Sequence, residues 1–149
     1  MYHRIVKSII NKNFEALSKG NYNVLLQTVA NDVDHTFLGD SAIGGHRQSK
    51  EKLRLWFERV YRLFPNLSFT VKNIIVTGFP WHTLVAAEWT ADVTPKAGTP
   101  YINTGVHIIT LKWGKAIKIQ AFENAELVAK ACNTMIEHGI KEAGADQIS

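Results

Sequence analysis

The chain of 149 residues has a single cysteine, Cys132, so it cannot form an internal disulfide. Proteins of oxidising compartments favour paired cysteines, and the N-terminal segment is amphipathic rather than built like a secretion signal. Both features predict a cytoplasmic protein. The neighbours Val128, Ala131 and Met135 are apolar, which favours a buried structural thiol over a reactive one.

Long apolar runs and clusters of like charge are also missing. No stretch approaches the roughly 20 apolar residues of a membrane-spanning helix, so we expect no membrane partner. The net charge is +4, but the 17 lysines and arginines are scattered along the chain instead of forming a basic stripe. We therefore expect no nucleic-acid partner.

Motifs for metals and nucleotides are absent as well. The six histidines show none of the spacings that metal sites use. There is no phosphate-binding glycine loop, no serine elbow between a strand and a helix, and no dinucleotide fingerprint. The sequence therefore predicts no metal and no cofactor.

What the sequence does contain is a helical first half. Apolar residues recur at helical spacing over 5–17, and Gly20 suits the position after a helix end. Ser49 is a suitable N-cap for a further helix, which Pro65 ends. The pattern predicts a helix over 5–17, a short helix after Asn21, a strand over 33–37, a loop over 38–48 and a helix over 49–64.

The second half is rich in β-branched and aromatic residues, with turn signals at regular intervals. It predicts strands over 67–78, 81–94, 101–113 and 116–124, followed by a helix over 125–142. The alternation slips at Asn73, which predicts a bulge there. Helices and strands that are segregated in this way indicate one α+β domain, in which 125–149 forms a C-terminal helix and tail of the domain built by 1–124.

Three parts of the chain resemble the nuclear transport factor 2-like superfamily, and more closely its SnoaL-like group of polyketide cyclases and ketosteroid isomerase relatives. The resemblance covers roughly residues 3–124. Its segments are DHTFLGD at 34–40 with GHR at 45–47, GTPYINTG at 98–105, and GKAI at 114–117 with FEN at 122–124.

This resemblance implies a cone-shaped, strongly curved antiparallel sheet wrapped around N-terminal helices. It also implies an apolar cavity inside the cone and a homodimer formed through the outer face of the sheet. Many relatives have an aspartate where this chain has Asn124. Because asparagine exchanges no proton near neutral pH, that position cannot supply the same chemistry here.

His35 is the first candidate for chemistry, because relatives of the ketosteroid isomerases place their base at the corresponding strand. An unperturbed imidazole pKa of about 6.5 suits proton transfer. Asp34 and Asp40 are near enough in sequence to orient the ring or pair with it. The alternative is a hydrogen-bonded structural histidine.

The strand over 101–113 carries the second group of candidates. Tyr101, Asn103 and His107 share one face by period two, and Ile102, Thr104, Val106 and Ile108 share the other. Parity alone does not decide which face is inside. We assign the Tyr101 face to the cavity, with His107 as a catalytic candidate, because phenol, amide and imidazole suit recognition of a small ligand. The alternative places His107 at a dimer interface.

Aromatic side chains supply the predicted cavity wall. Trp89 alternates with polar neighbours and should point inward. Trp56 and Tyr61 lie on the apolar face of the helix over 49–64, and Phe37 ends the short strand. Each either contacts a ligand or simply fills the core.

The last strand poses a conflict between two lines of argument. Alternation turns Glu123 inward, where an apolar setting would raise its pKa and make it a catalytic acid. The resemblance instead turns Phe122 and Asn124 toward the pocket, which would require a bulge or an early end of the strand.

Three classes of function remain open on the sequence. The first is a cofactor-independent isomerase, cyclase or dehydratase that acts on a small apolar molecule with a carbonyl or hydroxyl. The second is a non-catalytic protein that binds such a molecule. The third is a dimeric interaction module whose cavity is incidental.

Overall fold

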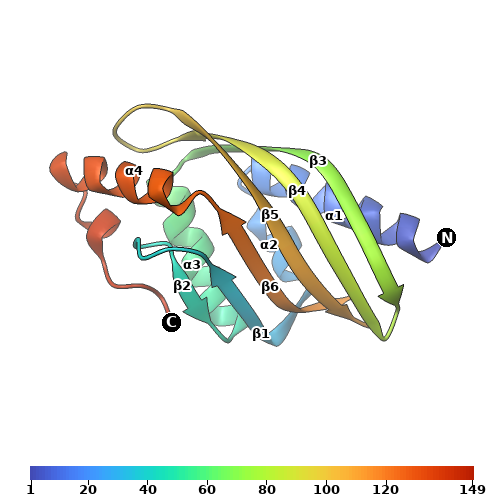
Figure 1. Ribbon diagram of the computed structural model, residues 1–149. Coiled ribbons are helices and arrows are strands. Elements are labelled where there is room, and N and C mark those ends of the chain that lie inside the picture. Colours follow the sequence, from blue (N-terminus) through green and yellow to red (C-terminus); the bar gives the residue numbers. More distant parts are fainter.

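Six strands form a single curved sheet in the order β2-β1-β6-β5-β4-β3 (Figure 1). The computed structural model describes residues 1–149. The strands are β1 (Val29–Phe37), β2 (Gly45–Arg47), β3 (Asn66–Phe79), β4 (His82–Thr94), β5 (Tyr101–Lys112) and β6 (Lys115–Glu123). The helices are α1 (Tyr2–Ser18), α2 (Tyr22–Leu26), α3 (Lys50–Leu63) and α4 (Ala125–Glu137), followed by the 3₁₀ turn η1 (Lys141–Gly144).

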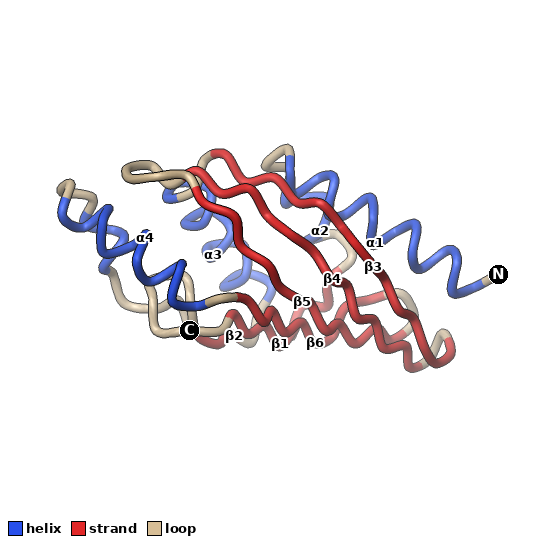
Figure 2. Tube along the Cα trace, turned by 45° about the horizontal axis from the view of Figure 1, so that its top comes forward, coloured by secondary structure: helices blue, strands red, loops and turns tan.

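Helices α1, α2 and α3 lie on one side of the sheet, and α4 lies at one end of it (Figure 2). This arrangement confirms the predicted α+β cone. The local signals for the helices act as expected. Gly20 follows the end of α1 with a φ of 74°, a conformation that glycine adopts without strain. The Ser49 hydroxyl caps α3 by accepting the backbone N–H of Lys52 at 3.1 Å.

The sheet is antiparallel except at one junction. β3, β4, β5 and β6 form an antiparallel meander, whereas β1 pairs with β6 in parallel, with His35 opposite Ile119. The expectation of a wholly antiparallel sheet was therefore wrong at this pair. Period-two patterns identify strands, but they do not tell which strands become neighbours when helix α3 and the whole meander separate them in sequence.

The bulge predicted at Asn73 is present. Val71 lies opposite Trp89 and Asn73 opposite Glu88, so Lys72 is the extra residue of β3. The insertion returns Ile74 to the inner face of the sheet, where it is buried. A bulge also increases local twist, which helps a strand of this length to curl around the helices.

Three predicted boundaries differ from the structure. β1 begins at Val29 rather than 33, with a register irregularity between Val29 and Asp34. The predicted loop over 38–48 contains β2, which pairs with β1. α4 ends at Glu137 rather than 142, because Gly139 takes a φ of 85° that no helix continues through.

α4 belongs to the same hydrophobic core as the cone. Its buried residues Val128, Ala131, Cys132 and Met135 join one cluster with side chains of α1, α3 and the inner strand faces. Met135 has no exposed surface. None of the helices has the length and apolar character needed to cross a bilayer.

Because Met135 is fully enclosed, we expect the substitution Met135→Ala to lower the free energy of unfolding by about 2–4 kcal/mol, through lost apolar burial and the cavity left behind. Its neighbour Ile136 is 45% exposed, so Ile136→Ala should cost much less. Urea denaturation followed by circular dichroism measures both. Equal losses in the two variants would show that α4 is not anchored through the face that carries Met135.

Candidate functional site

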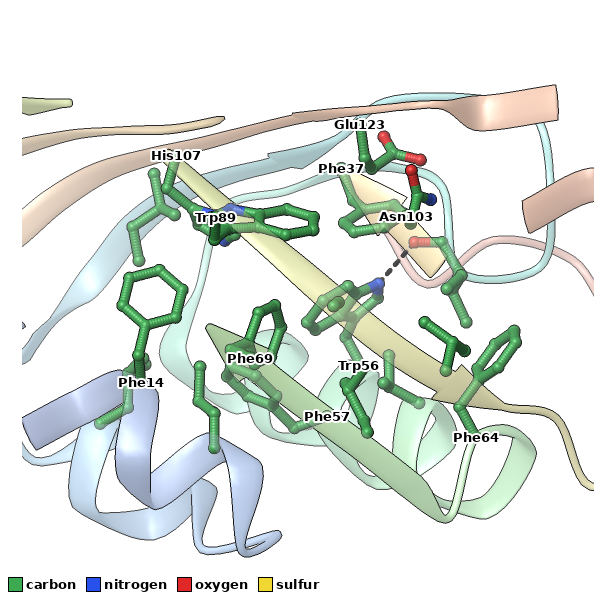
Figure 3. A pocket seen from close by; sticks show the side chains of 18 of the residues that line it. Phe14, Phe37, Trp56, Phe57, Phe64, Phe69, Trp89, Asn103, His107 and Glu123 are labelled. Atoms are coloured by element: carbon green, nitrogen blue, oxygen red, sulfur yellow. Dashed lines mark hydrogen bonds between the residues drawn. The ribbon is translucent and has the colours of Figure 1, made fainter. Parts of the chain in front are cut away.

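A cavity lies between the concave face of the sheet and the helices (Figure 3). It encloses about 1010 Å³, part of which is open to solvent, and 20 of its 25 lining residues are hydrophobic. We call it the main cavity. Its aromatic lining residues are Phe14, Phe37, Trp56, Phe57, Tyr61, Phe64, Phe69, Trp89 and Tyr101. A wall of this composition favours a flat, mostly apolar ligand.

A few polar side chains interrupt the apolar wall: Asn13, His35, Asn103, His107 and Glu123. Figure 3 shows Glu123 beside Asn103 and Phe37 at one end, while His107 lies beside Trp89 and Phe14 toward the other. No group of three histidine, cysteine, aspartate or glutamate side chains is arranged to hold a metal ion. The polar chemistry that the chain itself supplies here comes from hydroxyl, amide, imidazole and carboxyl groups.

Glu123 is the most unusual of these residues. Its side chain points inward at the end of β6 and only 8% of the residue is exposed. Neither carboxylate oxygen has a hydrogen-bond partner. Burial raises the pKa of Glu123 to about 7, although the nearby backbone N–H groups of Glu123 and Leu38 oppose this shift. The carboxyl group is thus divided between its charged and neutral forms near neutral pH.

Tyr101 lies close enough to Glu123 to sense its charge. Burial, together with the nearby Cys132 thiol and Glu123 carboxyl, raises the pKa of the Tyr101 phenol above its usual value. The hydroxyl makes no hydrogen bond to the protein and lines the main cavity. It therefore remains protonated and is free to donate a hydrogen bond to a ligand.

His35 is held by an arginine. Arg47 of β2 donates from Nη1 to Nδ1 of His35 at 2.7 Å, and the two residues are opposite each other in the β1–β2 register. A guanidinium can only donate, so the proton of the neutral ring is on Nε2. Burial and the Arg47 charge hold the pKa of His35 well below its usual value of 6.5. The ring is therefore a neutral hydrogen-bond donor at neutral pH.

Arg47 itself is 1% exposed and has no carboxylate among its hydrogen-bond partners. Its other donors reach the carbonyl oxygens of Gly44 at 2.7 Å and Ile148 at 2.9 Å. The guanidinium also lies over the ring of Trp56, 5.4 Å from its centre. At this distance the cation is attracted to the face of the aromatic ring. Burial, with the nearby charge of Arg59, lowers the pKa of Arg47 to about 10, so it stays charged.

His107 is held in the same tautomer by a different donor. The indole N–H of Trp89 donates to Nδ1 of His107 at 2.7 Å, which leaves the proton on Nε2. Burial lowers the pKa of His107 to about 4. The indole of Trp89 packs directly over Gly105 on its way to His107. A Cβ added at position 105 would lie only 2.6 Å from the indole ring. A glycine is therefore required at position 105.

Several predicted cavity residues line the wall with their polar atoms already engaged. Oδ1 of Asn103 accepts the backbone N–H groups of Thr104 at 2.8 Å and Asn124 at 3.1 Å. The hydroxyl of Tyr61 donates to the carbonyl of Leu17, and the indole of Trp56 donates to the carbonyl of Ile43, both at 2.6 Å. These side chains offer a ligand mainly their apolar surface.

Three predicted site residues lie outside the cavity. Phe122 is 43% exposed on the outer face, Asn124 caps α4 by accepting the N–H of Glu126 at 3.1 Å, and Asp40 is exposed in a loop. The pairing of β5 with β6 runs without a break through Phe122 and Glu123. Without the bulge that the resemblance required, regular alternation turns Glu123 inward and Phe122 outward.

Two residues of the site were not predicted. Arg47 fixes His35, and Asn13 of α1 lines the cavity without a hydrogen bond to the protein. Asp34, considered as a partner for His35, instead pairs with His46. Strand alternation in the triplet GHR at 45–47 points His46 and Arg47 to opposite faces. Nothing in the sequence indicated that this triplet would pair with β1 and place Arg47 opposite His35.

The raised pKa of Glu123 has a consequence for stability. Its folded-state pKa of about 7 lies above the usual 4.5, so ionisation is less favourable in the folded chain. Wild-type protein should lose about 3 kcal/mol of stability relative to Glu123→Gln as the pH rises from 4.5 to 8. Urea titrations of both proteins across this range measure the difference. A difference that does not change with pH would show an ordinary carboxyl pKa.

Comparisons with known proteins agree with this architecture. A structure of an NTF2-like protein of unknown function from Burkholderia pseudomallei K96243 is 16% identical, covers 84% of this chain and 95% of its own, and has a TM-score of 0.75. A candidate scytalone dehydratase from Novosphingobium aromaticivorans is 13% identical, with coverage of 83% and 84% and a TM-score of 0.70. A candidate SnoaL-like polyketide cyclase from Jannaschia sp. CCS1 is 19% identical, with coverage of 83% and 88% and a TM-score of 0.65.

At these identities the likeness to solved structures shows the fold alone. A search of curated proteins found no match. The family comparison is more specific, because residues 10–119 match the SnoaL-like domain and this stretch contains the second half of α1, all of α2 and α3, and most of the sheet. The chain therefore belongs to the SnoaL-like domain family.

Proposed function

We propose that this protein is a cofactor-independent enzyme that moves a proton on a small, mostly apolar molecule bearing a carbonyl or hydroxyl group. The reaction classes that fit are isomerisation, cyclisation and dehydration. The observation that carries the proposal is Glu123, a buried carboxyl group without a partner at the end of an apolar cavity. Leaving such a group unpaired costs stability, so its retention points to use by a ligand.

Glu123 has the properties of a general base and acid. With a pKa of about 7 it is partly charged at neutral pH. Its oxygens have no side-chain partner, and the backbone N–H groups of Glu123 and Leu38 are near without forming a regular hydrogen bond. In the charged form it can remove a proton from carbon next to a carbonyl group. The electron pair of the broken C–H bond then moves to the carbonyl oxygen as an enolate, and the protonated carboxyl group can return the proton to carbon.

Neutral donors are available for the oxygen that becomes negative. The Tyr101 hydroxyl is close to Glu123, and both His35 and His107 present a protonated Nε2 that makes no hydrogen bond to the protein. Donors that are fixed before the reaction stabilise developing charge without reorganising. The bonds from Arg47 and Trp89 keep both rings in the donor tautomer.

The comparisons support the same reaction classes. A candidate dehydratase and a candidate polyketide cyclase have the fold of this chain. The residues that would act here are argued from this cavity, because fold does not determine reaction.

A protein that binds its ligand without chemistry is the second candidate. It is favoured by the two histidines, whose low pKa values make them poor proton carriers near neutral pH. It is also favoured by Asn124, which caps a helix where many relatives have an acid. Glu123 is then the one cavity residue able to transfer a proton near neutral pH. Substitution of Glu123 therefore distinguishes a catalyst from a binding protein.

The test uses 2-tetralone, a bicyclic aromatic ketone, and follows exchange of its α-protons with D₂O by NMR. We expect Glu123→Gln to slow the protein-catalysed exchange by about 10²–10⁴-fold, because glutamine accepts no proton. Glu126→Gln is the matched control, since Glu126 is exposed three residues further along. The wild-type rate should rise with pH and level off above about 7, where the base is charged.

Two results would count against catalysis. The first is proton exchange at the same rate with wild-type protein, with Glu123→Gln and in buffer alone. If 2-tetralone still quenched tryptophan fluorescence, the protein would bind the ketone without catalysis. A pH profile without a step near 7 would assign the base to another group.

We also propose a homodimer formed through the outer face of the sheet. Ile102 is 64% exposed on β5, and Phe122 is 43% exposed on β6. On the same face of β5, Val106 lies opposite Phe122 and Ile108 follows it, and both are only half-buried. Neighbouring apolar side chains on one sheet face favour association. We expect light scattering to give twice the chain mass of 16.7 kDa, and Ile102→Glu to give the monomer mass. A wild-type monomer at micromolar concentrations would refute the dimer.

A further inference from the structure

A second cavity adjoins the main one on the side of α1. It encloses about 600 Å³, part of which is open to solvent, and 11 of its 14 lining residues are hydrophobic. Its walls come from α1, the α2 region, the start of β1, and the β5–β6 hairpin. The lining residues found only here are Tyr2, Ile5, Val6, Ile9, Thr28, Val29, Leu111, Gly114 and Ala116.

The two cavities adjoin each other along α1. Five residues line both of them: Ile10, Asn13, Leu25, Ile109 and Ile119. A residue that borders two cavities leaves no further layer of side chains between them. A small movement of this single shared wall would join the two cavities.

The second cavity also reaches the surface. Ile5 is 50% exposed, Ile9 is 44% exposed, and Gly114 is exposed at the hairpin turn. By contrast, every residue that lines the main cavity is buried or half-buried. The second cavity thus offers an opening to solvent on the α1 side, in addition to the open part of the main cavity.

Exposed aromatic side chains are found next to Gly114, which lines the second cavity. Trp113 is 67% exposed beside Gly114, and Trp81 is 54% exposed with its ring centre 6.3 Å from that of Trp113. Phe79 stacks on Trp81 with ring centres 5.0 Å apart. An exposed aromatic cluster favours contact with an apolar group over a polar one.

Polar groups are almost absent inside the second cavity. The Tyr2 hydroxyl bonds to the Thr83 hydroxyl at 2.5 Å, and the Thr28 hydroxyl donates to the carbonyl of Leu25 at 2.8 Å. Only Asn13, at the junction, has an amide without a protein partner. The polarity therefore falls from the Glu123 end of the main cavity to the mouth of the second.

We propose that the second cavity binds the unbranched apolar tail of the ligand whose oxygen-bearing head occupies the main cavity. The position of the head rests on the proposed function. From Asn13 to Tyr2 the axis of α1 rises about 16 Å, which is long enough for an extended alkyl chain of about ten carbons. The substrate class is accordingly an aryl or cyclic ketone, or the corresponding alcohol, with a linear alkyl tail of about that length.

The test measures affinity for acetophenone, hexanophenone and decanophenone, which share a head and differ only in tail length. Quenching of tryptophan fluorescence or calorimetry gives each dissociation constant. In wild-type protein we expect affinity to rise about two- to fourfold for each added methylene that is buried. Acetophenone, which has no tail, serves as the internal reference.

Ala116→Leu is the informative variant, because Ala116 is 5% exposed and lines only the second cavity. The larger side chain should fill the tail site, so that affinity no longer rises from hexanophenone to decanophenone. Ala16→Leu makes the same change on α1 at a residue that lines neither cavity, and should retain the wild-type rise. Ile9→Trp, at the exposed mouth, repeats the test without altering a buried position.

The possible results separate the two proposals. Affinity that does not rise with tail length in wild type, or that rises equally in Ala116→Leu and Ile9→Trp, overturns the tail site. Loss of the rise in those two variants alone supports it. Proton exchange on 2-tetralone reports on Glu123 independently, so an intact tail site without exchange would refute only the catalytic proposal.

Discussion

The direction in which β6 ends determines the chemistry of this cavity. Asn103 accepts the backbone N–H of Asn124 and donates to its carbonyl at 3.3 Å, and thereby holds the last residues of β6 against β5. With the strand kept in register, Glu123 must face inward. Asn124 then starts α4 through its own side chain. One pair of asparagines therefore places the carboxyl group and also begins the helix that covers this end of the cone.

The electrostatic design of the cavity is one of neutral donors around a single titrating acid. His35 and His107 differ in position and partner, but both are prevented from charging and both keep the Nε2 proton. Neutral rings offer hydrogen bonds to a ligand oxygen without adding a charge to the apolar cavity.

Much of the fold could be predicted from local patterns. The helix end before Gly20, the cap at Ser49 and the bulge at Asn73 each follow from a rule about a few neighbouring residues. Alternation indicated that Trp89 points inward and that Tyr101, Asn103 and His107 share one face, and their side-chain chemistry favoured the cavity for that face. All four line the main cavity. At β6, alternation favoured Glu123 where the resemblance favoured Phe122 and Asn124, and the unbroken register decided between them.

The remaining features depend on contacts between distant segments. The parallel pairing of β1 with β6, and the bond from Arg47 to His35, join parts of the chain that no periodicity relates. Hydrogen-bond partners that engage Asn103 and Tyr61 are backbone groups, which every residue has and no sequence pattern distinguishes. The types of side chain therefore predict where a site lies. Only the structure shows which of its polar groups lack a hydrogen-bond partner in the protein.

The hydrogen bond from Arg47 to the carbonyl of Ile148 connects the end of the described chain to the interior. Arg47 is a buried cation whose hydration is replaced by three acceptors, and this segment supplies one of them. Detachment of the segment would leave the guanidinium under-coordinated and the imidazole of His35 less firmly fixed. Local unfolding at the periphery and rotational order of a ring in the cavity are therefore thermodynamically linked, over a separation of 101 residues in sequence.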